Sequence, residues 1–245
     1  MENALMVALT RQMTLRRELS ITANNLANMN TAGFKVEKLL LASKSGATSS
    51  HADGPNKINF VQDWGVARDF SDGRIEITGR PLDVALIGKG FFAVETPDGE
   101  RYTRDGRFKV DQTGTLSTSD GMMVLDDTGA PILMDAFGGA PSIDQKGIIS
   151  IDGAEIGRLK VVGFAALGGL AKDGSGRYRA PEGAIPETIE TPKIMQAYLE
   201  RSNVVPILEI NRMVEVTRSY QSVSNMLKSE EDTSRQAIQR LGRVA

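Results

Sequence analysis

The chain has 245 residues, 40% of them hydrophobic, which is enough to form a substantial core in one large domain or two small ones. A net charge of −2 gives no basic field to attract nucleic acid, and no stretch approaches the roughly 20 apolar residues of a membrane-spanning helix. The absence of cysteine excludes disulfides, thiol nucleophiles and cysteine–metal sites. Glycine at 25 positions favours turns and β structure over an all-helical body.

The N-terminal segment 1–34 is predicted to form an amphipathic helix that ends in a sharp turn. Its apolar and small residues recur in alternating steps of three and four, with two polar exceptions. This row consists of Leu5, Ala8, Gln12, Leu15, Leu19, Thr22, Leu26 and Met29. Asn and Gly in the stretch 28–33 tolerate left-handed backbone angles and predict the end of the helix. The segment lacks the continuous apolar run of a signal peptide, so we expect any export to use another system.

The segment 35–71 is predicted to be a linker or extended stretch. Residues 44–56 are rich in Ser, Gly, Ala and Asn, which indicates a flexible loop. The loop contains the only histidine, His51, and the lone tryptophan, Trp64, follows it. We expect a solvated histidine and a tryptophan that anchors a core or an interface.

Residues 72–191 are predicted to form an antiparallel β domain, with 141–186 as a candidate subdomain. Short apolar runs alternate with turn signals, and Pro97-Asp98-Gly99 between two such runs indicates a hairpin. Further Asp-Gly pairs punctuate the rest of the region. A Gly- and Pro-containing break at 136–143 separates two sets of strands.

The C-terminal segment 192–245 is predicted to contain a return segment and a second amphipathic helix, with Pro206 in its first turn. The helix repeats the three–four spacing at Ile210, Met213, Thr217, Tyr220, Ser224, Leu227, Glu231, Ser234, Ile238 and Leu241. We therefore expect a mainly β centre flanked by N- and C-terminal helices that pair as a coiled coil. Both seams carry polar interruptions, which favours folding on assembly with neighbouring molecules over a self-sufficient helix pair.

No pattern in the sequence indicates catalytic, cofactor-binding or metal-binding residues. The Asp-Gly pairs lack the ligand spacing of a calcium loop, and Gly88-Lys89-Gly90 lacks the third glycine of a phosphate-binding loop. One histidine without cysteine rules out common triads and zinc sites. A secreted, carboxylate-based glycan hydrolase is the alternative from another class, but no spacing singles out its pair of carboxylates.

Residues 23–35, ANNLANMNTAGFK, closely resemble a signature of the bacterial flagellar rod and hook proteins. Residues 78–92 and 102–108 resemble a segment shared by rod and hook subunits, and residues 201–221 resemble the terminal helix of the family. The pattern departs at Ala32, where proline is common, and at Gln221, where glutamate is common. The short length and the opening residues are most similar to a proximal rod subunit, with a distal rod subunit as the near alternative.

The resemblance implies a non-enzymatic, multi-domain axial subunit of the basal-body rod in the periplasmic space. It implies neighbouring proximal and distal rod subunits and the flagellar export apparatus as partners, with no cofactor. The expected assembly residues are Leu5, Leu15, Leu19, Asn24, Asn25, Leu26, Asn28, Gly33, Phe34, Asn203, Val204, Ile210, Met213, Val214, Tyr220 and Leu227. Among them, the asparagines are expected to satisfy hydrogen bonds where the helix turns out. We expect Asn25→Leu to leave monomer folding intact and to impair assembly.

Overall fold

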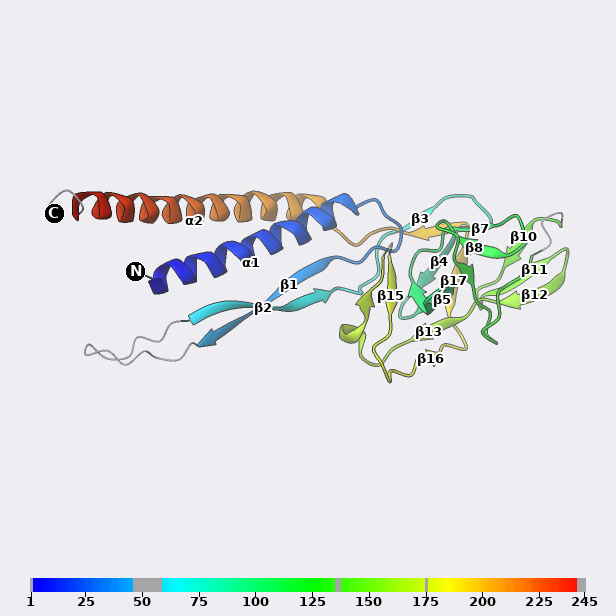
Figure 1. Ribbon diagram of the computed structural model, residues 1–245. Helices are drawn as coiled ribbons and strands as arrows, with labels where there is room; N and C mark the ends of the chain where they lie inside the picture. The colour runs from blue at the N-terminus through cyan, green and yellow to red at the C-terminus, as the bar shows by residue number, and fades with distance from the viewer. Residues whose placement is uncertain (1, 46–58, 135–137, 175, 242–245) are drawn as a thin grey trace. The chain divides into compact units, whose positions relative to one another are not determined.

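The computed structural model describes residues 2–45, 59–134, 138–174 and 176–241, and its contacts divide the chain into two compact units. We call them the helical unit, drawn from Met1–Ala27, Glu37–Arg68 and Val205–Ala245, and the β unit, drawn from Asn28–Val36 and Asp69–Val204. Between an N-terminal and a C-terminal helix the chain is mainly β, as the sequence predicts (Figure 1).

Two long helices dominate the helical unit. Helix α1 spans Glu2–Ala27 and helix α2 spans Pro206–Leu241. The predicted position of Pro206 at the start of α2 is confirmed. Proline is tolerated there because the first turn of a helix does not need the N–H group that proline lacks. After α1, the Thr31 N–H donates to the Asn28 carbonyl over 3.1 Å and closes a turn. The helix therefore ends in the stretch that the sequence indicates.

Within the segment 35–71, which the sequence predicts to be a linker or extended stretch, the described residues form two long strands that pair as a β-hairpin. Strand β1 (Glu37–Ser45) pairs antiparallel with β2 (Asn59–Arg68), and the hairpin contacts α1. Leu39 is buried, and a bulge between Leu40 and Leu41 leaves both of these leucines exposed. The bulge interrupts the alternation that marks a strand in sequence. His51 lies outside the described residues, as does the side chain of Trp64.

Short antiparallel strands make up the β unit. Its largest sheet contains β5 (Phe91–Thr96), β6 (Gly99–Thr103), β7 (Phe108–Val110), β8 (Leu116–Thr118), β9 (Met123–Val124), β13 (Val161–Gly163), β14 (Ala171–Lys172), β15 (Arg177–Arg179) and β16 (Glu187–Thr188). Its main path runs β14-β15-β6-β5-β9-β8-β7, and β13 joins β5 to β16. A 3-10 turn, η1, lies at Leu167–Gly169.

Three smaller sheets complete the β unit. One contains β10 (Pro141–Ile143), β11 (Ile148–Ile151) and β12 (Ala154–Arg158). The others pair β4 (Val84–Ile87) with β17 (Lys193–Gln196), and β3 (Ile75–Ile77) with β18 (Tyr198–Glu200). The return segment therefore belongs to the β unit. The boundary expected at residue 192 had grouped it with the C-terminal helix instead.

The predicted hairpin at Pro97-Asp98-Gly99 is confirmed. Strands β5 and β6 pair from Phe92 opposite Thr103 to Thr96 opposite Gly99, so two residues form the turn. The candidate subdomain at 141–186 differs from the structure: β10 to β12 form their own sheet, whereas β13 to β15 belong to the large one. Pairings between strands distant in sequence, such as Val161 with Phe92, decide this division.

The β unit has two main hydrophobic clusters. The larger lies around Phe92, Phe108 and Ile149, and the second around Phe91, Tyr102 and Tyr178. The rings of Phe92 and Phe108 meet edge to face with 5.3 Å between centroids. These clusters show that the β unit has a core of its own, as an independent domain requires.

Candidate assembly interface

Helices α1 and α2 lie side by side and antiparallel within the helical unit (Figure 1). Glu18 on α1 accepts from the Arg212 guanidinium on α2 at 2.9 Å, and Asn25 donates to Glu209 at 3.0 Å. Residue numbers therefore increase along α1 in the direction in which they decrease along α2. Ala8, Leu15, Ile21 and Thr22 are buried on α1, and Val216 is buried on α2.

The residues of the predicted seams fall into three groups. Leu15 is only 1% exposed, so it is buried by its own chain. Half-buried residues are Leu19, Leu26, Met213, Tyr220 and Leu227. Leu5, Ile210 and Val214 are each at least 44% exposed. The structure therefore leaves only this last group fully open to a partner, and their role in assembly stays a prediction.

Both helices carry exposed apolar rows that the sequence reasoning missed in part. On α1, Leu5, Leu9 and Met13 follow at intervals of four, with Met6 beside them, and all four are at least half exposed. On α2, Ile207, Ile210 and Val214 follow at intervals of three and four. Residues at these spacings share one face of a helix. The sequence reasoning missed Met6, Leu9 and Met13 because it followed the heptad row through Leu15, and these three residues lie outside that row.

The side chain of Asn25 joins three elements of the helical unit. Its amide nitrogen donates to the Glu37 carbonyl at 2.8 Å and to the Glu209 carboxylate, and its amide oxygen accepts from the Glu37 N–H at 3.0 Å. Asn25 is 1% exposed. These bonds lie within one chain, so we expect Asn25→Leu to destabilise the monomer as well as to impair assembly, whereas the sequence alone predicted intact monomer folding. Asn24 also donates to Glu37, over 3.3 Å.

Glu37 gives the hairpin a charged anchor in the same unit. Its carboxylate accepts from the Arg68 guanidinium at 2.9 Å, and the two residues are directly opposite in the β1–β2 register. Glu37 is 8% exposed, so its charge needs these partners. The hairpin and both helices thus meet around Asn25 and Glu37.

The remaining predicted residues belong to the β unit. Phe34 and Val204 are buried with Val36 in a small cluster, and the Lys172 ammonium lies 4.7 Å from the centre of the Phe34 ring. Asn203 accepts from the Val36 N–H at 2.8 Å and donates to the Asp69 carbonyl at 2.8 Å. Asn28 caps the turn after α1 through the Thr31 hydroxyl. Their contacts are within the chain and leave assembly roles untested.

Gly33 has a conformation and a location that no other residue fits easily. Its φ is +67°, and an added Cβ would lie 2.4 Å from the carbonyl carbon of Arg104. Its N–H donates to the Glu200 carbonyl at 2.8 Å. Close approach of two backbones therefore requires glycine here.

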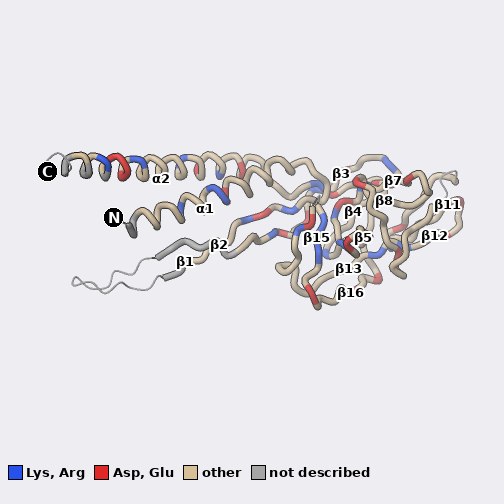
Figure 2. The backbone as a smooth tube through the Cα atoms, viewed as in Figure 1, with Lys and Arg blue, Asp and Glu red and all other residues tan. Residues whose placement is uncertain are grey.

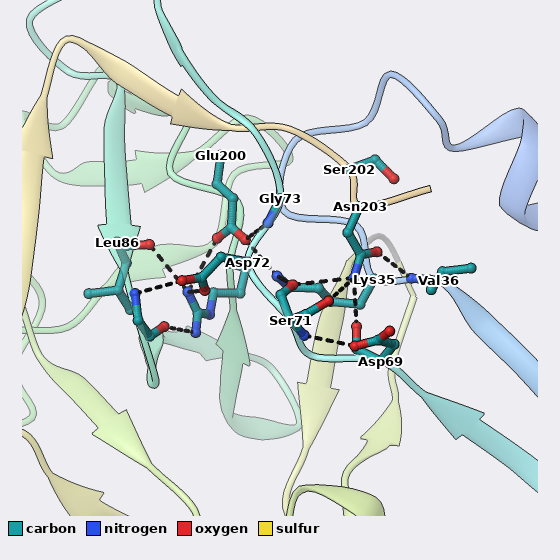
Figure 3. A network of polar contacts seen from close by, with 12 residues as sticks. Lys35, Val36, Asp69, Ser71, Asp72, Gly73, Leu86, Glu200, Ser202 and Asn203 are labelled. Carbon is teal, nitrogen blue, oxygen red and sulfur yellow. Dashed lines mark hydrogen bonds and ion pairs between the residues drawn. The ribbon is translucent and has the colours of Figure 1, made fainter. Parts of the chain in front are cut away.

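A buried ionic network fastens the segments around residues 33–36, 69–73 and 200–204 to one another (Figure 3). The Lys35 ammonium donates to Glu200 at 2.5 Å and to the Ser71 carbonyl at 2.6 Å, and the side chains of Lys35 and Glu200 are 0% exposed. Glu200 also accepts from the Gly73 N–H at 2.9 Å and from Arg104 at 3.2 Å. Burial lowers the pKa of Lys35, and the Glu200 carboxylate opposes that shift.

The sequence reasoning did not single out Lys35, Arg104 or Glu200. Lys35 and Glu200 are 165 residues apart, so no local spacing shows the pair. A lysine between two apolar residues, Phe34 and Val36, was the available signal. The cost of removing both charges from water offsets much of the attraction between them. The main effect of such a buried pair is therefore to fix the positions of the segments that carry it.

Basic and acidic residues are unequally distributed along the helices (Figure 2). On α1, Arg16 and Arg17 are exposed, whereas Glu18 is half-buried and pairs with Arg212. On α2, Glu230, Glu231 and Asp232 are consecutive and exposed. Opposite charges on exposed helix faces provide complementarity for a partner.

Within the described part of the chain, no group of three or more acidic or histidine side chains is placed to hold a metal ion. No helix in the same residues is long and apolar enough to cross a membrane.

Three family descriptions match the chain. Residues 5–35 match "Flagella basal body rod protein", residues 85–151 match "Flagellar hook protein FlgE/F/G D1 domain", and residues 195–240 match "Flagellar basal body rod FlgEFG protein C-terminal". These matches cover both helices and part of the β unit.

Relatives are similar over nearly the whole chain. The chain is 44% identical to the flagellar basal-body rod protein FlgF of Caulobacter vibrioides, over 100% of both chains. It is 32% identical to FlgF of Rhizobium meliloti, over 99% of both chains. It is also 32% identical to the flagellar basal-body rod protein FlgG of Bacillus subtilis, over 90% of this chain and 92% of that relative.

Proposed function

Since the chain belongs to the flagellar basal-body rod protein family, we propose that it is a structural subunit of the rod, which joins other rod subunits through the faces of its helices. The full-length similarity to FlgF favours a proximal rod subunit, with the FlgG-like distal subunit as the alternative. The protein then acts in the basal body as part of the drive shaft and transmits torque by packing, without catalysis.

The exposed apolar rows carry this proposal. Leu5, Leu9 and Met13 are at least half exposed on a helix that already buries another row, which includes Leu15, against its own chain. A helix with one buried and one open apolar row is suited to packing on two sides. Contiguous exposed apolar surface also marks interaction sites on otherwise soluble proteins.

We further propose that the two helices pair as a coiled coil in the assembled rod and that assembly places additional helices on the exposed rows. The ion pair between Glu18 and Arg212 supports one fixed antiparallel arrangement of α1 and α2. Neighbouring rod subunits would supply helices to cover Ile207, Ile210 and Val214. Contacts between unlike surfaces repeat from subunit to subunit and therefore generate a helical assembly.

A rod subunit has to leave the cytoplasm, and we propose that the flagellar export apparatus carries this chain. Membership of the rod family supports the route. In cells without a functional export apparatus, the chain should accumulate inside the cell, whereas its appearance in the periplasm of such cells would contradict the route.

Complementation with variants at Leu9 tests the structural role. In a flagellated strain that lacks the chain, Leu9→Asp should fail to restore swimming and rod assembly, because a carboxylate would be buried without a partner in the interface. Leu9→Met keeps the position apolar and is the matched control. The purified Leu9→Asp monomer should unfold within about 0.5 kcal/mol of the parent, since Leu9 is 50% exposed. Normal swimming with Leu9→Asp would argue against an interface on this row.

A further inference from the structure

A cleft of about 480 Å³ lies in the β unit. It is lined by the end of β12, the start of β13, residues at and after β16, and the turn between β10 and β11 (Figure 1). Its charged lining residues are Asp127, Lys146, Arg158, Lys160 and Glu190. The volume falls in the range of about 300–1,000 Å³ that is typical of pockets for small molecules.

Main-chain hydrogen bonds hold the walls of this cleft. The Ile189 N–H donates to the Val161 carbonyl at 2.8 Å, which joins the segment after β16 to β13. The Leu159 N–H donates to the Gly147 carbonyl at 2.9 Å, which joins the turn before β11 to the end of β12. The cleft is therefore formed by paired backbone in the free chain, as binding sites for small molecules usually are.

Arg158 is a cation that is held in place at the cleft by carbonyl groups. Its Nε donates to the Lys146 carbonyl at 3.2 Å, and its Nη2 donates to the Glu190 carbonyl. Among the residues that the structure describes, no carboxylate lies within ion-pair distance of this half-buried guanidinium. Because a guanidinium has five N–H donors, two carbonyls leave three of them for another acceptor.

The same cleft is lined by two carboxylates, Asp127 and Glu190, and both residues are exposed. In the described part of the chain neither side chain forms an ion pair or a hydrogen bond. The Lys160 ammonium differs, because it lies 3.0 Å from the Glu100 carboxylate. Charges of both signs thus share one cleft without neutralising one another.

We propose that this cleft binds a small zwitterion of the peptide class, that is, a free amino acid or a short peptide with both ends uncapped. The ligand's carboxylate binds the Arg158 guanidinium, whose planar fork matches a carboxylate. The ligand's ammonium lies toward Asp127 and Glu190. A simple anion would be repelled by these two carboxylates, and a simple cation by Arg158 and Lys146, so the lining favours a ligand that carries both charges.

This proposal goes beyond the rod function. The cleft belongs to the β unit, whereas the exposed apolar rows that carry the rod function belong to the helical unit. Binding of a small zwitterion would be a further function of the chain.

Titration of the purified full-length chain with alanine and with trialanine tests the site. Nitrogen-15 NMR follows the backbone amides and the Nε–H group of Arg158, where we expect saturable shifts. Two capped peptides are the matched controls: N-acetyl-trialanine lacks the ammonium, and trialanine amide lacks the carboxylate. Each should bind about tenfold more weakly than trialanine, since each loses one charge-assisted contact.

Isosteric variants test the acidic side of the cleft. The double variant Asp127→Asn, Glu190→Gln should bind trialanine about tenfold more weakly and N-acetyl-trialanine at least as well as the parent chain does. Both positions are exposed, so thermal unfolding of this variant should match that of the parent. Glu187→Gln, at an exposed position on β16 outside the cleft lining, is the control and should bind trialanine normally.

Each outcome decides the proposal. Preference for uncapped trialanine that is lost in the double variant and kept in Glu187→Gln supports it. Equal binding of N-acetyl-trialanine would show a site for a carboxylate alone, such as the C-terminus of a partner chain, and overturns the zwitterion. Absence of saturable shifts with alanine and trialanine, or unchanged affinity in the double variant, overturns it as well. Such a result leaves the rod function intact, because complementation with the Leu9 variants tests that function separately.

Discussion

Replacing Asn25 by leucine should destabilise the helical unit of the free monomer. The substitution removes both bonds to the Glu37 backbone and the bond to the Glu209 carboxylate. An unsatisfied buried group costs about 1–3 kcal/mol, and the larger apolar side chain recovers about 1 kcal/mol at a site that fits it. With two backbone groups and one carboxylate affected, we expect a net loss of about 3 kcal/mol.

Urea unfolding can isolate this effect in the helical unit. Circular dichroism at 222 nm follows the helices, and the fluorescence of Trp64 reports β2 of the same unit. Two probes are needed because a chain with two units need not unfold in one step. Both transitions should move to lower urea, while a probe of the β unit stays in place.

A matched variant two residues earlier separates hydrogen bonding from side-chain size. Ala23 lies on the other side of the same helix and is exposed, so Ala23→Leu should change the stability by less than about 0.5 kcal/mol. The reasoning would be refuted if Asn25→Leu were as mild as Ala23→Leu. That result would mean that water or a local rearrangement satisfies the Glu37 backbone.

The β unit offers three further predictions. Lys35→Met should lower its unfolding free energy by about 3–5 kcal/mol in urea, because it breaks a fully buried pair with Glu200; a loss below 1 kcal/mol would contradict this. Gly33→Ala should cost several kcal/mol more than Gly79→Ala, since both glycines have positive φ but an added Cβ meets other atoms within 4 Å only at Gly33; equal losses in thermal unfolding would exclude the steric argument. The hydrogen bond from the Thr113 hydroxyl lowers the pKa of Asp111, so Thr113→Val should raise it in a carboxylate NMR titration. A depressed carboxyl pKa contributes stability above the unfolded value that disappears as the pH falls through the folded value, so this variant should also show a smaller acid-dependent loss. An unchanged titration midpoint would contradict the assignment.

Local chemistry explains the features that the sequence predicts correctly. The end of α1 and the β5–β6 hairpin depend on Asn, Gly and Pro within a few residues, and their backbone preferences act without the rest of the fold. The start of α2 at Pro206 has the same origin. Such features are legible in one stretch of sequence.

Pairings over long distances account for what the sequence does not reveal. The hairpin of β1 and β2 has a bulge at Leu40–Leu41 that disrupts its alternation, and the partners of β17 and β18 lie more than 100 residues earlier in the chain. The buried pair of Lys35 and Glu200 is likewise non-local. On α1 the two apolar rows overlap in sequence, so periodicity alone cannot show that Leu15 faces its own chain while Leu9 is open.

The stretch 23–35 serves two units at once, which explains why so many of its residues have special roles. Asn24 and Asn25 bind Glu37 within the helical unit, whereas Gly33 and Lys35 bind Glu200 within the β unit. Asn28 and Thr31 form the turn between these two sets. Substitutions on the two sides of Asn28 should therefore destabilise different units, and the Asn25→Leu and Lys35→Met transitions distinguish them. If both variants shifted the same transition by the same amount, the two units would unfold as one, and the separate roles assigned to the two ends of this stretch would be wrong.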